Sequence, residues 1–182
     1  MRWERPWVTA CAAACAASAT TTATALPSAG RPDPDDVRGC ATRGDSNHPA
    51  KPPVTGAIRI GPLIVWPTVR RVVPTTDKVW PYVTKAPVML PARVRATLSI
   101  APEAAGRAGL WRIRGGYVST VRFLACRERE LAHGYRGTVG RFTQFPFSFA
   151  LKDPSACVPM EVWVDGEATP HRRVVPVGRD SC

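Results

Sequence analysis

Apolar and polar residues alternate in short runs along the chain after residue 56, and proline or glycine interrupts most of these runs. The alternation is clearest from Arg93 to Ile100, where every second residue is apolar. A period of two predicts a β-strand with one buried and one solvated face. Similar patterns predict strands over residues 58–66, 79–85, 109–114, 117–126, 142–151, 158–164 and 171–177. About eight short strands at this spacing predict an all-β fold, an immunoglobulin-like antiparallel β-sandwich.

Two glycine-containing pairs predict which of these strands are neighbours. Asp165-Gly166 separates the last two strands, and Gly115-Gly116 separates the two strands before Cys126. Both pairs supply residues that tolerate a positive φ, as tight hairpin turns require. The one stretch with helical character, residues 102–108, is too short to be stable as an independent helix.

The first 30 residues have the layout of a secretory signal peptide. Arg2 and Arg5 precede a run rich in alanine and threonine, and small residues follow it up to Gly30. This three-part pattern predicts a secreted protein with residues 1–30 as the signal peptide. A lipid anchor on Cys11 is the less favoured alternative, because hardly any apolar run precedes that cysteine. No later segment reaches the roughly 18 apolar residues of a membrane span, so none is expected in the mature form.

The remainder divides by composition into an arm and a domain. Residues 31–56 are rich in proline, aspartate and glycine and have no apolar periodicity, which predicts an extended arm. Residues 57–182 are predicted to form the β-sandwich domain. This is enough chain for one hydrophobic core and too little for two ordinary domains.

The chain is strongly basic, with 25 Lys and Arg against 14 Asp and Glu and a formal net charge of +11. For an exported protein this charge favours an anionic partner, either a cell-envelope polymer bearing phosphate or carboxylate or a surface protein. A composition biased toward arginine also follows from GC-rich codon usage. Nucleic acid is not expected as a partner, and we expect a monomer.

Four cysteines follow the signal peptide: Cys40, Cys126, Cys157 and Cys182. In an exported chain an even number of cysteines predicts disulfides, here two. No Cys-x-x-Cys or His-x-x-x-His spacing is present, so neither a metal nor another cofactor is expected.

Four segments carry a resemblance to a known group of proteins: residues 121–126, which end in a cysteine, the aromatic residues 145–149, residues 157–162, and the basic strand that closes on Cys182. With these segments the chain resembles small secreted β-sandwich proteins of actinobacteria that have no assigned function. The resemblance implies an exported β-sandwich and a Cys126–Cys157 bridge, which would leave Cys40 to pair with Cys182. It implies no catalytic residue. The residues themselves leave the other pairing open, Cys40 with Cys126 and Cys157 with Cys182.

Tryptophans that lie among basic residues give the clearest indication of a ligand site. Aromatic surfaces beside cations suit a glycan or an anionic ligand. Packing in the core is the alternative role for these tryptophans. The candidate ligand-binding residues are Trp66, Arg70, Arg71, Trp80, Trp111 and Arg112. They predict a non-catalytic binding module, associated with the cell envelope or surface, and not an enzyme.

Two other functions remain open at the level of sequence. Glu128, Glu130 and His133 lie close together in a polar stretch and could act as the acid and base of a small hydrolase. The segment from Cys157 to Met160 is similar to the reactive-site region of secreted subtilisin inhibitors, in which Met160 would be presented to a protease. The inhibitor interpretation requires Met160 to be exposed.

Overall fold

The computed structural model describes residues 30–44, 51–130 and 139–182. The chain divides into two units, Met1–Gly30 and Arg31–Cys182. Apart from Gly30, the predicted signal peptide lies outside the described residues, and the account below concerns the second unit. Within the described ranges, no helix has the length and apolar character needed to cross a membrane.

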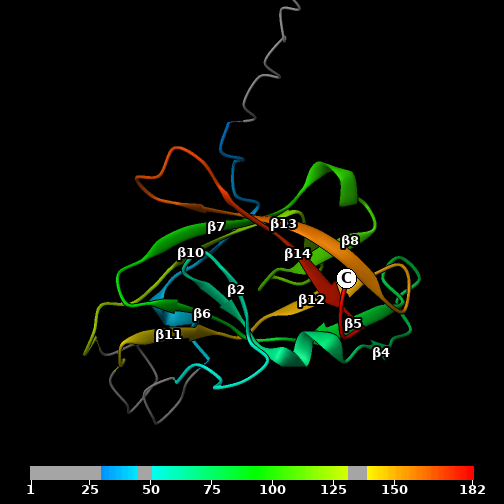
Figure 1. Ribbon diagram of the computed structural model, residues 1–182, viewed down its shortest axis with the longest axis horizontal. Helices are drawn as coiled ribbons and strands as arrows, with labels where there is room; N and C mark the ends of the chain where they lie inside the picture. Colours follow the sequence, from blue (N-terminus) through cyan, green and yellow to red (C-terminus); the bar gives the residue numbers. More distant parts are fainter. Residues whose placement is uncertain (1–29, 45–50, 131–138) are drawn as a thin grey trace, which may run out of the picture. The chain divides into compact units, whose positions relative to one another are not determined.

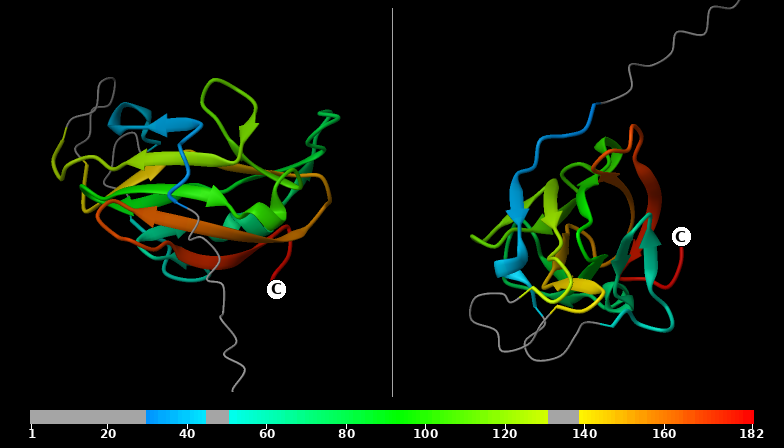
Figure 2. Two further views of the ribbon diagram at one scale, coloured as in Figure 1. Left: turned by 90° about the horizontal axis from the view of Figure 1, so that it is seen from above. Right: turned by 90° about the vertical axis from the view of Figure 1, so that its left-hand side faces the viewer.

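One sheet contains five strands in the order β1-β10-β7-β13-β14. Its strands are β1 (Asp36–Arg38), β10 (Thr120–Leu124), β7 (Arg95–Ile100), β13 (Ala156–Val164) and β14 (His171–Val177). The left view of Figure 2 shows them following one another across the sheet. β1 pairs with β10 in parallel, and the other pairs are antiparallel. Part of the predicted arm therefore belongs to this sheet, because β1 lies within residues 31–56.

The other described strands form two further sheets (Figure 1). The second sheet consists of β11 (Phe142–Phe145), β6 (Val88–Pro91), β3 (Leu63–Val65) and β2 (Ile58–Ile60), in that order. The third consists of β4 (Val73–Pro74), β5 (Tyr82–Lys85), β12 (Ser148–Leu151), β8 (Ala108–Trp111) and β9 (Tyr117–Val118). The only helices in the described residues are short 3-10 turns, η1 (Cys40–Thr42), η2 (Pro67–Arg70) and η3 (Pro102–Ala104).

One apolar core lies among the three sheets. Ala96 and Leu98 point into it from β7, and four phenylalanines meet in it through tilted or edge-on ring contacts. These phenylalanines are Phe123, Phe145, Phe147 and Phe149. The predicted all-β, sandwich-like fold is confirmed. The two expected hairpin pairs are also present, β8 with β9 and β13 with β14.

Proline and glycine divide two segments that the alternation predicts as single strands. Residues 58–66 form β2 and β3, which a turn at Gly61 separates, where φ is +55°. Residues 142–151 form β11 and β12 on either side of Pro146. Pro87 separates β5 from β6 at the facing position, and Ala86 donates a backbone hydrogen bond of 3.0 Å to the Phe147 carbonyl. Because proline has no N–H to donate, the two-stranded ribbon bends here and passes from one sheet to the next.

The disulfides join Cys40 to Cys126 and Cys157 to Cys182, with Cα separations of 4.9 and 5.7 Å. The Cys126–Cys157 and Cys40–Cys182 pairing is therefore wrong. Strand order explains the difference, because β7 lies between β10, which precedes Cys126, and β13, which contains Cys157. β1 is the neighbour of β10 and ends just before Cys40. Cys157 lies opposite Pro176 of β14, the strand that leads to Cys182.

Candidate functional site

Two of the predicted ligand-binding tryptophans lie close to the same tyrosine. Trp111 at the end of β8 is the cross-strand partner of Tyr117 in β9. The ring of Trp80 lies 5.8 Å from the ring of Tyr117, with an interplanar angle of 54°. All three side chains are half-buried. We call Trp80, Tyr117 and Trp111 the aromatic strip.

Gly109 allows the strip to pack closely on the sheet. A Cβ atom at this position would lie 2.8 Å from Tyr117 Cβ and 3.2 Å from Trp80 Cζ2. The first distance is shorter than real Cβ atoms show, so a larger residue at this position would displace Tyr117 from β8. Burial and the nearby Asp77 carboxylate both raise the pKa of Tyr117, so its hydroxyl remains protonated at neutral pH and can donate a hydrogen bond.

A groove of about 530 Å³ adjoins the strip. It is lined by Val83, Lys85, Pro87, Trp111, Tyr117, Pro146, Phe147 and Ser148. The prolines come from the bend between the second and third sheets, so the interruption of the ribbon also shapes the groove. Its lining is mostly apolar with a few polar groups, as is typical of small-ligand sites. We call this feature the aromatic groove.

Arg38 of the arm supports the groove from within the protein. Its side chain is fully buried and donates hydrogen bonds to the carbonyls of Trp111 and Pro146, both of which line the groove. Its guanidinium lies 4.7 Å from the Trp111 ring centroid and 4.8 Å from that of Phe147. Asp36 accepts a hydrogen bond from Nε at 3.2 Å. Burial lowers the pKa of Arg38 and Asp36 opposes that change, but an arginine remains charged at neutral pH.

Of the six predicted ligand residues only Trp111 lines this groove, and the other five, Trp80 among them, do not. Trp66 precedes η2, Arg70 ends it and Arg71 follows it. Arg112 is next to Trp111 in sequence, but its Nε donates to the Gly115 carbonyl in the β8–β9 turn at 2.8 Å. The Arg112 side chain therefore stabilises the β8–β9 turn by this hydrogen bond.

The prediction of a protease inhibitor is wrong, because it requires Met160 to be exposed. Met160 is only 1% exposed and lies within β13, with Ile100 of β7 on one side and Arg173 of β14 on the other. A residue in the middle of a sheet cannot be presented to a protease. The core needs an apolar side chain at this position, and Met160 supplies it.

The residues of the hydrolase alternative are only partly within the described chain. Glu128 is exposed, and Glu130 is half-buried with its Oε2 accepting the backbone N–H of Arg127 at 2.6 Å. His133 lies outside the described residues.

The one group of potential metal ligands in the described chain is Cys40, Cys126 and Glu130. Both cysteines are in a disulfide, so Glu130 alone could coordinate an ion.

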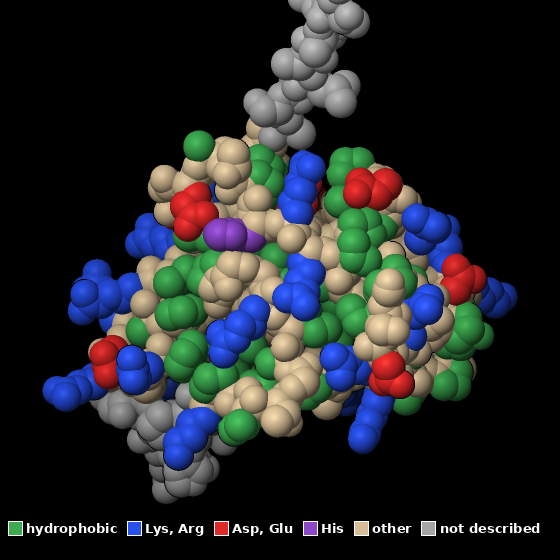
Figure 3. Space-filling view, in the orientation of Figure 1, with side chains coloured by type: hydrophobic (Ala, Val, Ile, Leu, Met, Phe, Trp, Pro, Cys, Tyr) green, Lys and Arg blue, Asp and Glu red, His purple; other side chains and the backbone are tan. Residues whose placement is uncertain are grey.

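Positive charge does not gather at one place on the face shown in Figure 3. Lys and Arg side chains are spread over it, with Asp and Glu among them. Net charge alone therefore does not identify a site on this face.

Sequence reasoning missed Tyr117 and Arg38. A signal for Tyr117 was present, because the Gly115-Gly116 turn makes residues 111 and 117 cross-strand neighbours. Arg38 had no such signal, since its partners are 73 and 108 residues away in the chain.

A comparison with protein-family models, curated proteins and solved structures finds no match for the chain.

Proposed function

We propose that the protein is an exported, non-catalytic module that binds a glycan of the cell envelope in the aromatic groove. The observation that carries the proposal is the continuity of Trp80, Tyr117 and Trp111 along the sheet beside this groove. A sugar ring has an apolar face of C–H groups and a rim of hydroxyls. Half-buried aromatic rings suit the first, and polar groups at the edge of the site suit the second.

The polar groups of the groove fit this ligand. Ser148 and the Tyr117 hydroxyl can exchange hydrogen bonds with sugar hydroxyls, and exposed Lys85 can pair with an acidic substituent. Arg38 covers one face of the Trp111 ring, so at most the opposite face is open to a ligand. By holding the Trp111 and Pro146 carbonyls, Arg38 also fixes two walls of the groove before a ligand arrives, which lowers the entropy cost of binding.

The test is sedimentation of the oxidised protein with host cell-envelope fragments over a salt series up to about 1 M, where charge interactions are screened within a few ångströms. Ser148→Trp fills the groove without removing an aromatic residue. Thr169→Trp adds the same side chain at an exposed position of the β13–β14 loop and serves as the control.

We expect the unaltered protein and Thr169→Trp to be retained in molar salt, and Ser148→Trp to lose at least tenfold in affinity. Thermal unfolding of each variant confirms that it is folded. Retention that disappears as salt rises would mean that the net charge of +11 acts alone. Equal retention of the two tryptophan variants would place the ligand outside the groove and overturn the proposal.

A further inference from the structure

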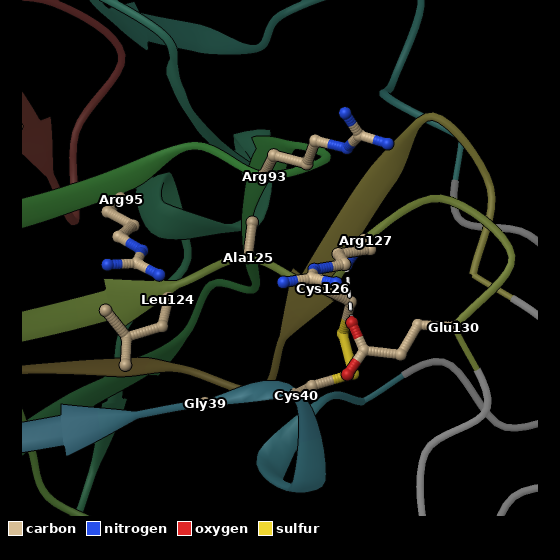
Figure 4. Close-up of a pocket in the computed structure, with 9 residues that line it drawn as sticks. All are labelled: Gly39, Cys40, Arg93, Arg95, Leu124, Ala125, Cys126, Arg127 and Glu130. Carbon is tan, nitrogen blue, oxygen red and sulfur yellow. Dashed lines mark hydrogen bonds between the residues drawn. A yellow bond between two sulfur atoms is a disulfide. The ribbon is translucent and has the colours of Figure 1, made fainter.

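A second pocket lies beside the Cys40–Cys126 disulfide and shares no lining residue with the aromatic groove. Its volume is about 560 Å³. Its walls come from the residues after β1, the start of β7, and the end of β10 with the residues that follow it. The lining residues are Gly39, Cys40, Arg93, Arg95, Leu124, Ala125, Cys126, Arg127 and Glu130 (Figure 4).

The lining carries excess positive charge. It contains three arginines, Arg93, Arg95 and Arg127, all exposed, and one acidic residue, Glu130, which leaves a net charge of +2. Within the described part of the chain, none of the three guanidiniums has an ion pair or a side-chain hydrogen bond. Glu130 is already engaged, because its Oε2 accepts the Arg127 backbone N–H. Among the described residues, the charge of these three cations is therefore only partly balanced, by Glu130.

Two of these cations are directed toward each other. In Figure 4 the side chains of Arg95 and Arg127 point toward one another across Ala125, while Arg93 extends away along the rim. Two facing guanidiniums with no carboxylate between them repel each other. An anion placed between them would replace this repulsion by two charge-assisted interactions.

The backbone around the pocket is also unusual. Arg93 and Arg129 are the non-glycine residues with positive φ in the described chain, at +68° and +65°. Arg93 lines the pocket, and Arg129 lies between two lining residues, Arg127 and Glu130. Hydrogen bonds from Arg93 N to the Cys126 carbonyl and from Arg129 N to the Val139 carbonyl, of 2.9 and 2.8 Å, hold these conformations. Such strained backbone conformations are concentrated at ligand sites in proteins.

We propose that this pocket binds a phosphate group, held between Arg95 and Arg127 with Arg93 able to turn inward as a third donor. The planar guanidinium forms paired hydrogen bonds with phosphate oxygens, which an ammonium cannot do. A phosphate monoester carries a charge of about −1.5 to −2 at neutral pH, which matches the lining. The disulfide that joins Cys40 to Cys126 holds the base of the pocket in place. The site is independent of the aromatic groove and of the function proposed for it.

The test is an NMR titration of the oxidised, ¹⁵N-labelled chain with inorganic phosphate and, separately, with glycerol phosphate, at constant ionic strength. We expect the Nε–Hε signals of Arg95 and Arg127 to shift and to saturate. Tighter binding of the ester would identify an esterified phosphate as the ligand, and tighter binding of inorganic phosphate would identify the free ion.

Three variants test which residues determine the affinity for phosphate. Arg95→Gln with Arg127→Gln should weaken binding about tenfold or more, since two charge-assisted bonds are lost. Glu130→Gln should strengthen it a few-fold by removing the nearby negative charge. Arg179→Gln, an exposed arginine outside the pocket, should leave affinity within twofold.

Thermal unfolding gives a second readout, because a ligand that binds the folded state raises the melting temperature. We expect phosphate to raise it for the unaltered chain and not for the double variant, and sodium chloride at matched ionic strength to have no such effect. Shifts that never saturate and affect all arginines alike, or a double variant that binds as well as Arg179→Gln, would overturn the proposal.

Discussion

The guanidinium of Arg38 lies 4.7 Å from the centre of the Trp111 ring and donates a hydrogen bond to the carbonyl of the same residue. One arginine of the N-terminal arm thus contacts both the ring and the backbone of a groove residue 73 positions later in the chain. The arm is fixed at both sides of this contact, since Asp35 accepts a hydrogen bond of 3.1 Å from Thr120 N and Cys40 is bonded to Cys126. The aromatic groove therefore depends on the arm.

Replacement of Arg38 should destabilise the protein strongly. Arg38→Met keeps much of the side-chain volume but leaves the carbonyls of Trp111 and Pro146 without their charged donor, at a cost of about 1–2 kcal/mol for each lost hydrogen bond. We expect a loss of about 2–4 kcal/mol in the free energy of unfolding, measured by urea denaturation. Arg114→Met, at an exposed position, should change it by less than about 0.5 kcal/mol. Equal effects of the two variants would contradict the role given to Arg38.

The two disulfides should differ in their contribution to stability. They close segments with sequence separations of 86 and 25. On the chain-entropy relation these loops correspond to about 4.5 and 3.5 kcal/mol. Replacing Cys40 and Cys126 by alanine should therefore cost more than replacing Cys157 and Cys182, as measured by urea denaturation. Mass spectrometry of unreduced proteolytic peptides checks the connectivity itself, and a peptide joining Cys126 to Cys157 would contradict the structure.

Gly61 should not tolerate alanine. Its φ is +55°, and a Cβ added here would clash with the ring of His171. Gly166 provides the matched control, because its φ is +88° but nothing lies within 4 Å of the added Cβ. Gly166→Ala should cost about 1–2 kcal/mol from the backbone alone, and Gly61→Ala should cost more. In a double-mutant cycle His171→Ala should relieve part of the Gly61→Ala cost. Equal costs at the two glycines would show that the His171 ring moves aside freely.

Tyr117 should titrate above the ordinary tyrosine range, because burial and Asp77 both raise its pKa. Subtracting the tyrosinate absorbance of a Tyr117→Phe variant isolates this group from the other two tyrosines. Asp77→Asn should lower the pKa of Tyr117 while retaining the side-chain oxygen that accepts the N–H groups of Val79 and Trp80.

The same shift predicts a pH dependence of stability. A pKa raised in the folded state means that the unfolded chain loses the Tyr117 proton first as pH rises. Its contribution to stability is therefore complete below about pH 10 and is lost as pH rises through the folded-state pKa. Tyr117→Phe should flatten the stability profile in this range. A profile that is unchanged by the substitution would contradict the raised pKa.

Local patterns were enough to predict most of the strands and two of the strand pairs, but β1, β4 and β6 lie outside every predicted strand. The alternation around Leu98 favours a strand in almost any β fold, and Gly115-Gly116 and Asp165-Gly166 favour turns whatever lies around them. The predicted solvated face of this strand is wrong beyond Arg95, because Thr97 and Ser99 are also buried. The division of residues 142–151 could also have been read from the sequence, because Pro146 cannot donate a hydrogen bond to a sheet ladder.

The sequence by itself therefore determined the class of fold, most of the strands, and the presence of two disulfides. The tertiary structure decided how the cysteines pair, because pairing follows the spatial order of strands and β7 separates Cys126 from Cys157. It also decided that Met160 is buried and that Arg38 reaches Trp111. Hydrophobic periodicity reports which face of an element is buried but not which element covers it. Contacts across tens of residues depend on sheet order and register, which no local pattern encodes.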